Sequence, residues 1–391
     1  MKITAVRPWI IQVPWSIRPG EEPSVDNKRE LLFCQVDTDE GITGWGEVTT
    51  YPGVVGNRSV AHMIREVGST LIGRDPAHIE RIWIDNVRTM TYVGTRGAVS
   101  ATASAIDIAL WDIQGKALNL PIYMLMGGPV RDRIALYTHP PSTTEPIQAA
   151  KDARAIVDAG YSAFKFDPMM HNIPEGNAHY IDGQLSRQGM EEAWEITAAI
   201  REEVGPAPEL LIDAHGKYNV PTAIDLCLGL EESNIFWFEE PVPVESNHAL
   251  RQVREKINAK ISVGERLFTR WEFVDIFENE LADFVMPDVT WTGGISELKK
   301  IATLAESYYV PISPHDASGP VNVMAGAQVM MTVPNFYKLE TSRYDLSDYN
   351  QFIDEPLDIR EGHLYIPDKP GLGVNLDPDA LERFAVEGFA G

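Results

Sequence analysis

Three acidic residues close three short apolar segments of the chain at equal intervals. Asp213 stands in ELLIDAHG, Glu239 in IFWFEEP and Glu265 in ISVGERL, each 26 residues after the one before. A period of roughly 25 residues suits one strand, one helix and two loops. In a parallel (β/α) barrel, strand ends of this kind converge on one face. Converging carboxylates repel one another unless a cation neutralises them, and oxygen ligands without cysteine indicate Mg²⁺ or Mn²⁺ rather than zinc.

Further acid–base residue types stand at the ends of these and other β-like segments. They are Lys165, Asp167, His215, Asp288, His315 and Glu340. Because side chains alternate along a strand, Lys165 and Asp167 share a face, as do Asp213 and His215. Any one of these residues has a simpler explanation, such as a solvated strand end or a turn cap. Six successive strands that end in metal-ligand or acid–base types favour a functional site.

The segments that must position these residues alternate between β-like and helix-like patterns. Residues 147–160 and 295–309 are examples of the helical stretches. Eight such units predict an α/β fold, a closed barrel with its active site at the carboxyl ends of the strands. The irregular loop after the second strand, residues 171–184, is of a kind that often lines a site. The β-like segments are 134–140, 163–168, 209–216, 235–241, 261–267, 283–290, 310–318 and 336–342.

The first third of the chain has a different pattern. Residues 1–50 alternate as antiparallel strands, with a turn at Asp39-Glu40-Gly41 and a polar loop at residues 18–30. Between about 57 and 118 the period becomes helical. We therefore expect an α+β domain over residues 1–125, a barrel domain over 126–360, and a tail, 361–391, that packs back on the first domain. One helical stripe comprises Ala105, Ile106, Ala109, Leu110 and Ile113.

The composition limits the class of partner. The 391 residues suggest two domains. A net charge of −24 argues against nucleic acid or an anionic membrane as partner, but not against a small anionic substrate. Cys34 and Cys227 lie in apolar surroundings and are expected to be buried and unpaired. The N-terminus does not resemble a signal peptide, and no run approaches about 18 apolar residues, so we expect a cytoplasmic protein.

Several motifs are specific enough to indicate a family. IDAHG, FEEP, GERL, PDVTWTGGI, PHDASGP and the PGLGV of the tail resemble the enolase superfamily, in its mandelate racemase subgroup, close to galactonate and gluconate dehydratases. The resemblance covers essentially the whole chain. It implies a modified (β/α)8 TIM barrel under an N-terminal capping domain that the tail completes. It also implies one Mg²⁺ held by Asp213, Glu239 and Glu265, with Glu240 pointing away.

The resemblance also suggests roles for the other strand-end residues. His315 with Asp288 would be the general base, and His215 the general acid for a departing hydroxyl. Lys165 would add positive charge beside the substrate carboxylate. Glu340 would be a carboxylic acid that hydrogen-bonds this carboxylate. The structural alternatives are an ion pair of Lys165 with Asp167, a polar packing pair at His315, and a plain strand-end Glu340 near Arg343.

One departure from the related racemases bears on the reaction. Racemases and cycloisomerases of the superfamily place a second lysine two positions after the first, where this chain has Asp167. An acidic side chain does not readily replace an amine base. The sequence therefore favours a one-base dehydratase of an aldonic sugar acid, giving a 2-keto-3-deoxy acid. A racemase or epimerase on the same site, or a non-catalytic sugar-acid-binding protein, are the alternatives.

The remaining candidates concern substrate contact and assembly. Substrate-binding candidates are Lys165, Asp167, His139 and Arg266, whereas His171 is expected to be solvated. The loops 15–30 and 51–58 fall where the capping domain of this family covers the barrel mouth. In them Asp26, Lys28 and Tyr51 are candidates for contact with hydroxyls. By resemblance we expect a homo-oligomer, from dimer to octamer.

Overall fold

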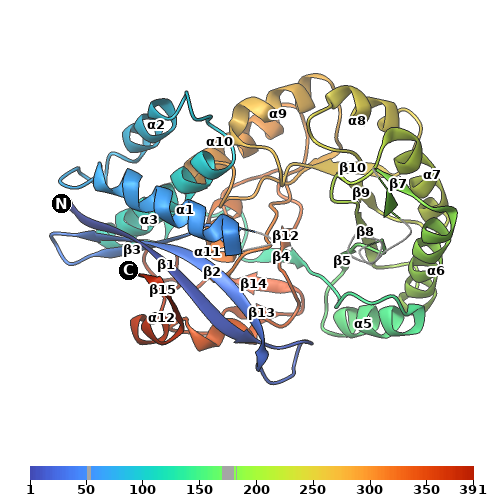
Figure 1. Cartoon of the computed structure of the whole chain (residues 1–391), viewed down its shortest axis with the longest axis horizontal. Coiled ribbons are helices and arrows are strands. Elements are labelled where there is room, and N and C mark those ends of the chain that lie inside the picture. Colours follow the sequence, from blue (N-terminus) through green and yellow to red (C-terminus); the bar gives the residue numbers. More distant parts are fainter. Residues whose placement is uncertain (51–53, 170–179, 182) are drawn as a thin grey trace.

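The computed structural model describes residues 1–50, 54–169, 180–181 and 183–391. A smaller part, built from both ends of the chain, lies beside a larger ring of strands and helices (Figure 1). Among the described residues no helix is long and apolar enough to cross a membrane. Both cysteines are buried and unpaired, as predicted.

A four-stranded antiparallel sheet in the order β15-β1-β2-β3 forms the smaller part. β2 begins at Ser24, so the prediction of a loop over residues 18–30 was partly wrong. Pairing with β1, which reaches Trp15 opposite Ser24, orders a polar stretch that carries no hydrophobic signal of its own. The strands are β1 (Ile3–Trp15), β2 (Ser24–Thr38), β3 (Thr43–Glu47) and β15 (Ala385–Ala390).

Helix α3 packs directly on this sheet through β3. A Cβ added at Gly46 would lie 1.8 Å from the carbonyl oxygen of Ala105, so only glycine allows this approach. The predicted apolar stripe of α3 is confirmed, because all five of its residues are buried in the core under the sheet. The helices of this part are α1 (Val54–Ser69), α2 (Ile79–Thr89), α3 (Ala98–Leu118) and α4 (Ile122–Leu125).

Eight strand positions of the larger part follow the predicted order, although each is shorter than expected. Seven are strands and the eighth is a single bridging residue, Ile312. A short antiparallel pair, β6 (Tyr180–Ile181) and β7 (Gln184–Leu185), was not predicted. The barrel strands are β4 (Ile134–Tyr137), β5 (Ala163–Phe166), β8 (Glu209–Asp213), β9 (Trp237–Glu239), β10 (Lys260–Val263), β11 (Phe284–Val285) and β12 (Leu339–Glu340).

The prediction of a closed barrel sheet was wrong. The parallel sheet β11-β10-β9-β8-β5 is separate from the sheet that contains β12 and β4, and isolated bridges such as Val285↔Ile312 and Thr138↔Phe164 lie between the two. The segment that contains Ile312 also contains Pro311 and Pro314, which have no backbone N–H to donate to a ladder. The strand order and the surrounding helices are nevertheless those of a (β/α)8 barrel.

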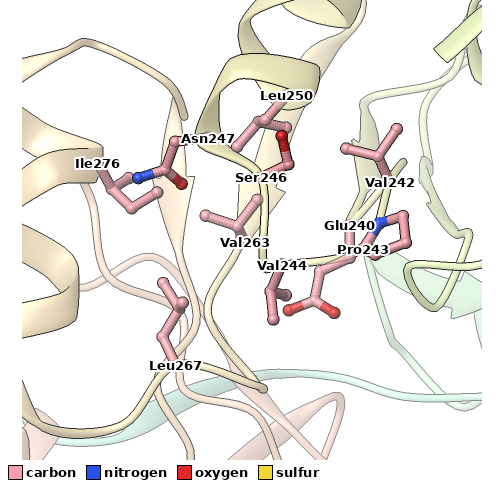
Figure 2. A pocket seen from close by; sticks show the side chains of 10 residues that line it. All are labelled: Glu240, Val242, Pro243, Val244, Ser246, Asn247, Leu250, Val263, Leu267 and Ile276. Carbon is pink, nitrogen blue, oxygen red and sulfur yellow. The ribbon is translucent and has the colours of Figure 1, made fainter. Parts of the chain in front are cut away.

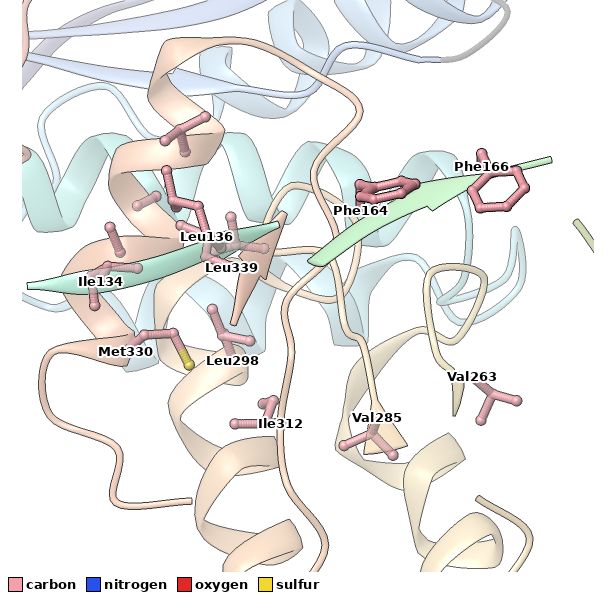
Figure 3. Packing of buried hydrophobic residues seen from close by; sticks show 14 of the residues in the cluster. Ile134, Leu136, Phe164, Phe166, Val263, Val285, Leu298, Ile312, Met330 and Leu339 are labelled. Atoms are coloured by element: carbon pink, nitrogen blue, oxygen red, sulfur yellow. The ribbon is translucent and has the colours of Figure 1, made fainter. Parts of the chain in front are cut away.

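Helices cover the outside of this ring (Figure 1). Side chains that point outward from the strands pack against them. Figure 3 shows Ile134 and Leu136 of β4 beside Leu339 of β12 and Met330 of α11. The helices are α5 (Pro146–Asp158), α6 (Arg187–Val204), α7 (Val220–Glu231), α8 (Asn247–Arg254), α9 (Thr269–Glu278), α10 (Gly294–Ser307) and α11 (Pro320–Met330).

The tail joins both parts. β14 pairs with β4 of the barrel, and β15 pairs with β1 of the N-terminal sheet. Between them the backbone N–H of Leu372 donates to the buried carboxylate of Asp112 on α3, at 2.9 Å. The remaining elements of the tail are β13 (Asp358–Arg360), β14 (His363–Tyr365) and α12 (Pro378–Phe384), preceded by a 3-10 turn, Ser347–Gln351.

Candidate active site

The site residues form one inward-facing layer at the carboxyl ends of the barrel strands. Below them, large side chains fill the barrel interior, so this interior is a packed core and not a pore. Several site residues stand two positions after a residue of that core, because inward positions on a strand repeat every second residue. The pairs are Tyr137 and His139, Ala163 and Lys165, Leu211 and Asp213, and Trp237 and Glu239.

The three predicted ligands are brought together in this layer. Asp213 and Glu239 are register partners at the ends of β8 and β9, and Glu265 follows β10. One carboxylate oxygen of each lies within 4.8 Å of those of the other two. Burial, and then the charge of Asp213, raise the pKa of Glu239 well above its usual value. The Oε2 of Glu239 is buried and has no hydrogen-bond partner among the described residues. An oxygen cluster with an unpartnered buried acceptor fits a hard divalent cation.

Lys165 lies among these carboxylates. Its Nζ is 2.7 Å from Glu239 Oε1, 3.3 Å from Asp213 Oδ2 and 2.9 Å from Glu340 Oε1. Burial lowers the pKa of Lys165, but the charges of Glu239 and Glu340 outweigh it and raise this pKa well above its usual value. Its ion-pair partners are therefore two of the predicted ligands and Glu340, and no ion pair with Asp167 is found among the described residues. One ammonium does not balance these three carboxylates.

His315 and Asp288 form the expected pair. His315 Nδ1 lies 2.8 Å from Asp288 Oδ2, and the other oxygen of Asp288 accepts from the N–H and hydroxyl of Thr290. With Asp288 fully buried and fixed in this way, the ring orientation of His315 is set. Nε2 is directed into the site and lies 3.0 Å from Glu265 Oε2.

The charge around His315 favours its protonated form. Burial lowers the pKa of His315, but the negative charges of Glu265 and Glu340 outweigh it and raise this pKa well above its usual value. Neutralising the charge on Glu265 would remove one of the two largest causes of this increase. The protonation of the histidine and the charge at the carboxylate cluster are therefore linked.

His215 reaches the same cluster from the other side. Its Nε2 lies 3.3 Å from Asp213 Oδ2, and its Nδ1 lies 2.9 Å from Asp167 Oδ2. His215 has a left-handed backbone conformation, with φ at 53°, which turns the chain after β8. Burial lowers the pKa of His215, but the charge of Asp213 and the hydrogen bond with Asp167 raise it overall.

Glu340 is an acceptor for several donors. Tyr137 Oη donates to its Oε2 at 2.8 Å, and His139 Nε2 and the Lys165 ammonium contact its Oε1. Burial raises the pKa of Glu340, but the charges of Lys165 and His315 outweigh it and lower this pKa below its usual value. This arrangement describes a carboxylate that orders its donors. The role that the resemblance implied, a carboxylic acid that hydrogen-bonds the substrate carboxylate, stays a prediction.

Two residues near Glu340 differ from what the sequence suggested. Tyr137 was not recognised as a site residue, although its place two positions before His139 on the same strand could have indicated it. Arg343 does not contact Glu340; it donates to Ser16 Oγ at 2.7 Å and pairs with Asp348. These contacts attach the end of β1 to the segment after β12.

Arg266 is paired with Glu240 and Glu265, and Glu240 points away from the three ligands, as expected. Figure 2 shows Glu240 at a small pocket lined mainly by apolar side chains, including Val242, Val263 and others from α8 and α9. None of the three ligands lines this pocket. An apolar pocket outside the polar layer is unsuited to a polyhydroxy acid.

Two of the residues proposed on the capping loops, Asp26 and Lys28, have no contact with the cluster among the described residues. Asp26 and Lys28 are exposed on β2. Tyr51 and His171 lie outside the described residues. Arg29 of β2 does reach the barrel, because it donates to the backbone oxygens of Ala317 and Ser318, just after His315.

A (β/α) barrel beside an α+β domain, with acidic residues at three adjacent strand ends, defines a class of capped-barrel proteins. Two family descriptions match the chain: the mandelate racemase / muconate lactonizing enzyme N-terminal domain over residues 6–127, and the enolase C-terminal domain-like family over residues 148–380. The chain therefore belongs to the mandelate racemase / muconate lactonizing enzyme family of the enolase superfamily.

Individual relatives agree with this assignment. The D-xylonate dehydratase of Haloferax volcanii is 33% identical over 371 residues, which cover 93% of this chain and 87% of that protein. The D-galactonate dehydratase of Xanthomonas oryzae pv. oryzae is 36% identical over 364 residues, 90% of each chain. A solved structure of an enolase superfamily member from Salmonella Typhimurium superposes with a TM-score of 0.87, at 31% identity and 98% coverage of both chains.

Proposed function

We propose that this protein is a Mg²⁺-dependent dehydratase of an aldonic sugar acid. The observation that carries the proposal is the convergence of two histidines, each paired with its own buried aspartate, on one carboxylate cluster. Dehydration next to a carboxylate needs one group that removes a proton and another that delivers one. The names of the sugar-acid dehydratases among its relatives support the same reading.

Asp213, Glu239 and Glu265 are the residues that would hold one Mg²⁺, with Mn²⁺ as a possible substitute. When bound there, the ion would supply a Lewis acid for the substrate carboxylate and for the charge that develops as C2 loses its proton. The ammonium of Lys165 lies beside the same ligands and stabilises negative charge in the same place.

His315 is the proposed base for the C2 proton. Its Nδ1 is held by Asp288, so Nε2 is the nitrogen presented to the substrate. Neutralisation of Glu265 would lower the pKa of His315 and so favour the unprotonated ring that proton abstraction requires. Asp288 then stabilises the imidazolium formed by this transfer.

His215 is the proposed acid for the C3 hydroxyl. Its raised pKa favours a ring that carries a proton to donate. Glu340, which accepts from Tyr137 and His139, would keep His139 and Lys165 in place beside the substrate. The enol left after loss of water tautomerises to the 2-keto-3-deoxy acid.

The experiment that tests this proposal is a screen with C5 and C6 aldonic and aldaric acids. The purified protein is incubated with Mg²⁺, and 2-keto acid is detected as its semicarbazone, with EDTA as control. We expect product from at least one aldonic acid and none with EDTA. Exchange of the C2 hydrogen in D₂O without elimination would favour a racemase or epimerase instead. Recovery of a bound, unchanged acid with neither reaction would favour a binding protein.

We further propose that the enzyme works in the cytoplasm as a homo-oligomer of two to eight subunits. Metabolic relatives and the sequence resemblance support this proposal. Light scattering after size-exclusion chromatography tests the assembly, and a monomer over the whole working concentration range would contradict it.

A further inference from the structure

Both carboxylate oxygens of Asp167 have partners within the protein. Its Oδ1 accepts from the backbone N–H of Met169 at 2.8 Å, and its Oδ2 lies 2.9 Å from His215 Nδ1 and 2.5 Å from Lys217 Nζ. The side chain of Asp167 is 1% exposed, whereas that of His215 is 28% exposed. The carboxylate is therefore behind the histidine, and the histidine is the member of the pair that faces the open site.

The geometry determines which ring nitrogen His215 presents. A carboxylate only accepts hydrogen bonds, so the nitrogen beside Asp167 carries a hydrogen. The other nitrogen, Nε2, then lies at the metal-ligand side, 3.3 Å from Asp213 Oδ2. The same relation holds between Asp288 and His315 on the other side of the cluster. The site thus contains two separate carboxylate–imidazole pairs.

Lys217 holds the carboxylate of Asp167 in place beside His215. The lysine comes from the turn after β8, and its ammonium shares Asp167 Oδ2 with His215. A neighbouring ammonium favours the ionised form of a carboxylate and holds its position. Lys217 thus reaches Asp167 from the turn after a different strand.

We propose that Asp167 is a positioning residue that holds His215 with Nε2 toward the leaving C3 hydroxyl of the substrate. The proposal rests on the proposed dehydration. In that step His315 takes the C2 proton, and the C2–H electrons form the C2–C3 double bond. The C3–O bond breaks with its electron pair, and the oxygen takes the proton of His215 Nε2 and leaves as water. Nδ1 keeps its hydrogen bond to Asp167 throughout.

A change of leaving group tests the proposal. Fluoride leaves without a proton, so a 3-deoxy-3-fluoro analogue of the substrate bypasses His215 and anything that acts through it. We expect Asp167→Asn to lower kcat for the natural substrate by about 10- to 100-fold. Fluoride release should stay within about threefold of wild type, and His215→Asn should show the same pattern, since loss of an acid affects only a step that needs one.

Asp283→Asn is the matched control. Asp283 is also a barrel aspartate that accepts a backbone N–H, from Ile261, but it stands at the opposite end of the strands. Asp283→Asn should dehydrate the natural substrate and release fluoride from the analogue at the rates of wild type. If Asp167→Asn lowers kcat equally for the natural substrate and for the fluoro analogue, Asp167 only shapes the site. If it lowers neither kcat, Asp167 has no role in the reaction.

A spectroscopic measurement tests the pair without turnover. Nitrogen-15 NMR of histidine-labelled protein reports which ring nitrogen is protonated, and the His215 signals are assigned by their loss in His215→Asn. We expect a protonated Nδ1 in wild type and a shift of both ring signals in Asp167→Asn. Unchanged signals would overturn the inference. If wild type dehydrates no acid while these signals shift as expected, the proposed function fails and the positioning of His215 by Asp167 stands.

Discussion

Lys165 shows how strongly each side chain of the site depends on its neighbours. A buried ammonium alone is unstable in a protein interior, and three buried carboxylates alone repel one another. Here Lys165 contacts Asp213, Glu239 and Glu340 at 2.7 to 3.3 Å, so each group makes the burial of the others possible. Single substitutions in this layer should therefore have specific effects on charge and proton transfer.

The first prediction concerns the base. In His315→Asn the new side chain is similar in size and has an amide N–H that can donate to Asp288, but it cannot accept a proton from the substrate. We expect kcat/KM to fall by about 10²- to 10⁴-fold. Exchange of the C2 hydrogen should be lost together with elimination, while circular dichroism and the unfolding transition remain those of wild type. Activity near that of wild type would exclude His315 as the base.

The second prediction concerns the metal. Glu239→Gln removes a charge from the carboxylate whose Oε2 has no partner in the structure. We expect Mg²⁺ affinity, measured by isothermal titration calorimetry, to fall by at least about tenfold. The neighbouring Glu240→Gln is the matched control, because Glu240 is equally buried but faces Arg266. Equal affinity in wild type and Glu239→Gln would refute the ligand assignment.

At the scale of elements, contact between β3 and α3 depends on the absence of a side chain. Gly46 faces the backbone of Ala105, and the neighbouring Gly44 faces that of Ala109 in the same way. Backbone atoms in a helix cannot move aside as a flexible side-chain end can. The two glycines therefore set the distance between the sheet and the helix that carries Asp107, which contacts Ser296 of the barrel.

The third prediction follows from this contact. In Gly46→Ala the new methyl group would lie 1.8 Å from a carbonyl oxygen, so β3 and α3 must separate. We expect the free energy of unfolding in urea to fall by about 1–3 kcal/mol or more. Gly326→Ala on α11 is the control, since its methyl group would meet only the end of Leu339, at 3.1 Å. Equal stability of wild type and Gly46→Ala would contradict this packing.

Several of these element-level features could be predicted from the sequence and others could not. The strand-end residues Asp213, Glu239 and Glu265 were found because their spacing repeats with the βα unit. The start of β2, the break in the barrel sheet at Ile312 and the partners of Asp167 depend on contacts between distant segments. No local sequence pattern predicts that Lys217 contacts Asp167, 50 residues away, so this contact is seen only in the fold.

At the scale of the whole molecule, buried carboxylates on the smaller part accept hydrogen bonds from helices of the barrel. Glu47 accepts the backbone N–H groups of Val321 and Asn322 at the start of α11. Asp107 accepts the N–H and hydroxyl of Ser296 at the start of α10. These contacts satisfy N–H groups that have no partner within their own helices. They hold the two parts of the molecule together.

The fourth prediction concerns the pH dependence of this interface. Burial raises the pKa of Glu47 to about 7, above the usual value of 4.5 that it regains on unfolding. Between these values the unfolded chain loses its proton first, so the contribution of Glu47 to stability falls as pH rises. Glu47→Gln removes this titration. Relative to wild type, its free energy of unfolding should rise by on the order of 1–3 kcal/mol between pH 5 and 8.

Urea unfolding at several pH values measures this difference. Asp358→Asn, which changes an exposed carboxylate on β13, is the control and should differ from wild type by the same amount at every pH. A difference between Glu47→Gln and wild type that does not change with pH would contradict a raised pKa at Glu47. A difference that falls as pH rises would mean that folding lowers the pKa of Glu47 instead of raising it.

The pairing of β15 with β1 affects when the N-terminal sheet can be completed during synthesis of the chain. The N-terminal sheet needs Ala390 opposite Trp9, so β1 lacks this partner until about 380 further residues have been made. At common rates of synthesis that wait lasts about 20 to 75 seconds. During this time the backbone N–H and C=O groups on one edge of β1 are unpaired, and another strand can pair with them. This edge of β1 therefore stays open to misplaced pairing until β15 has been made.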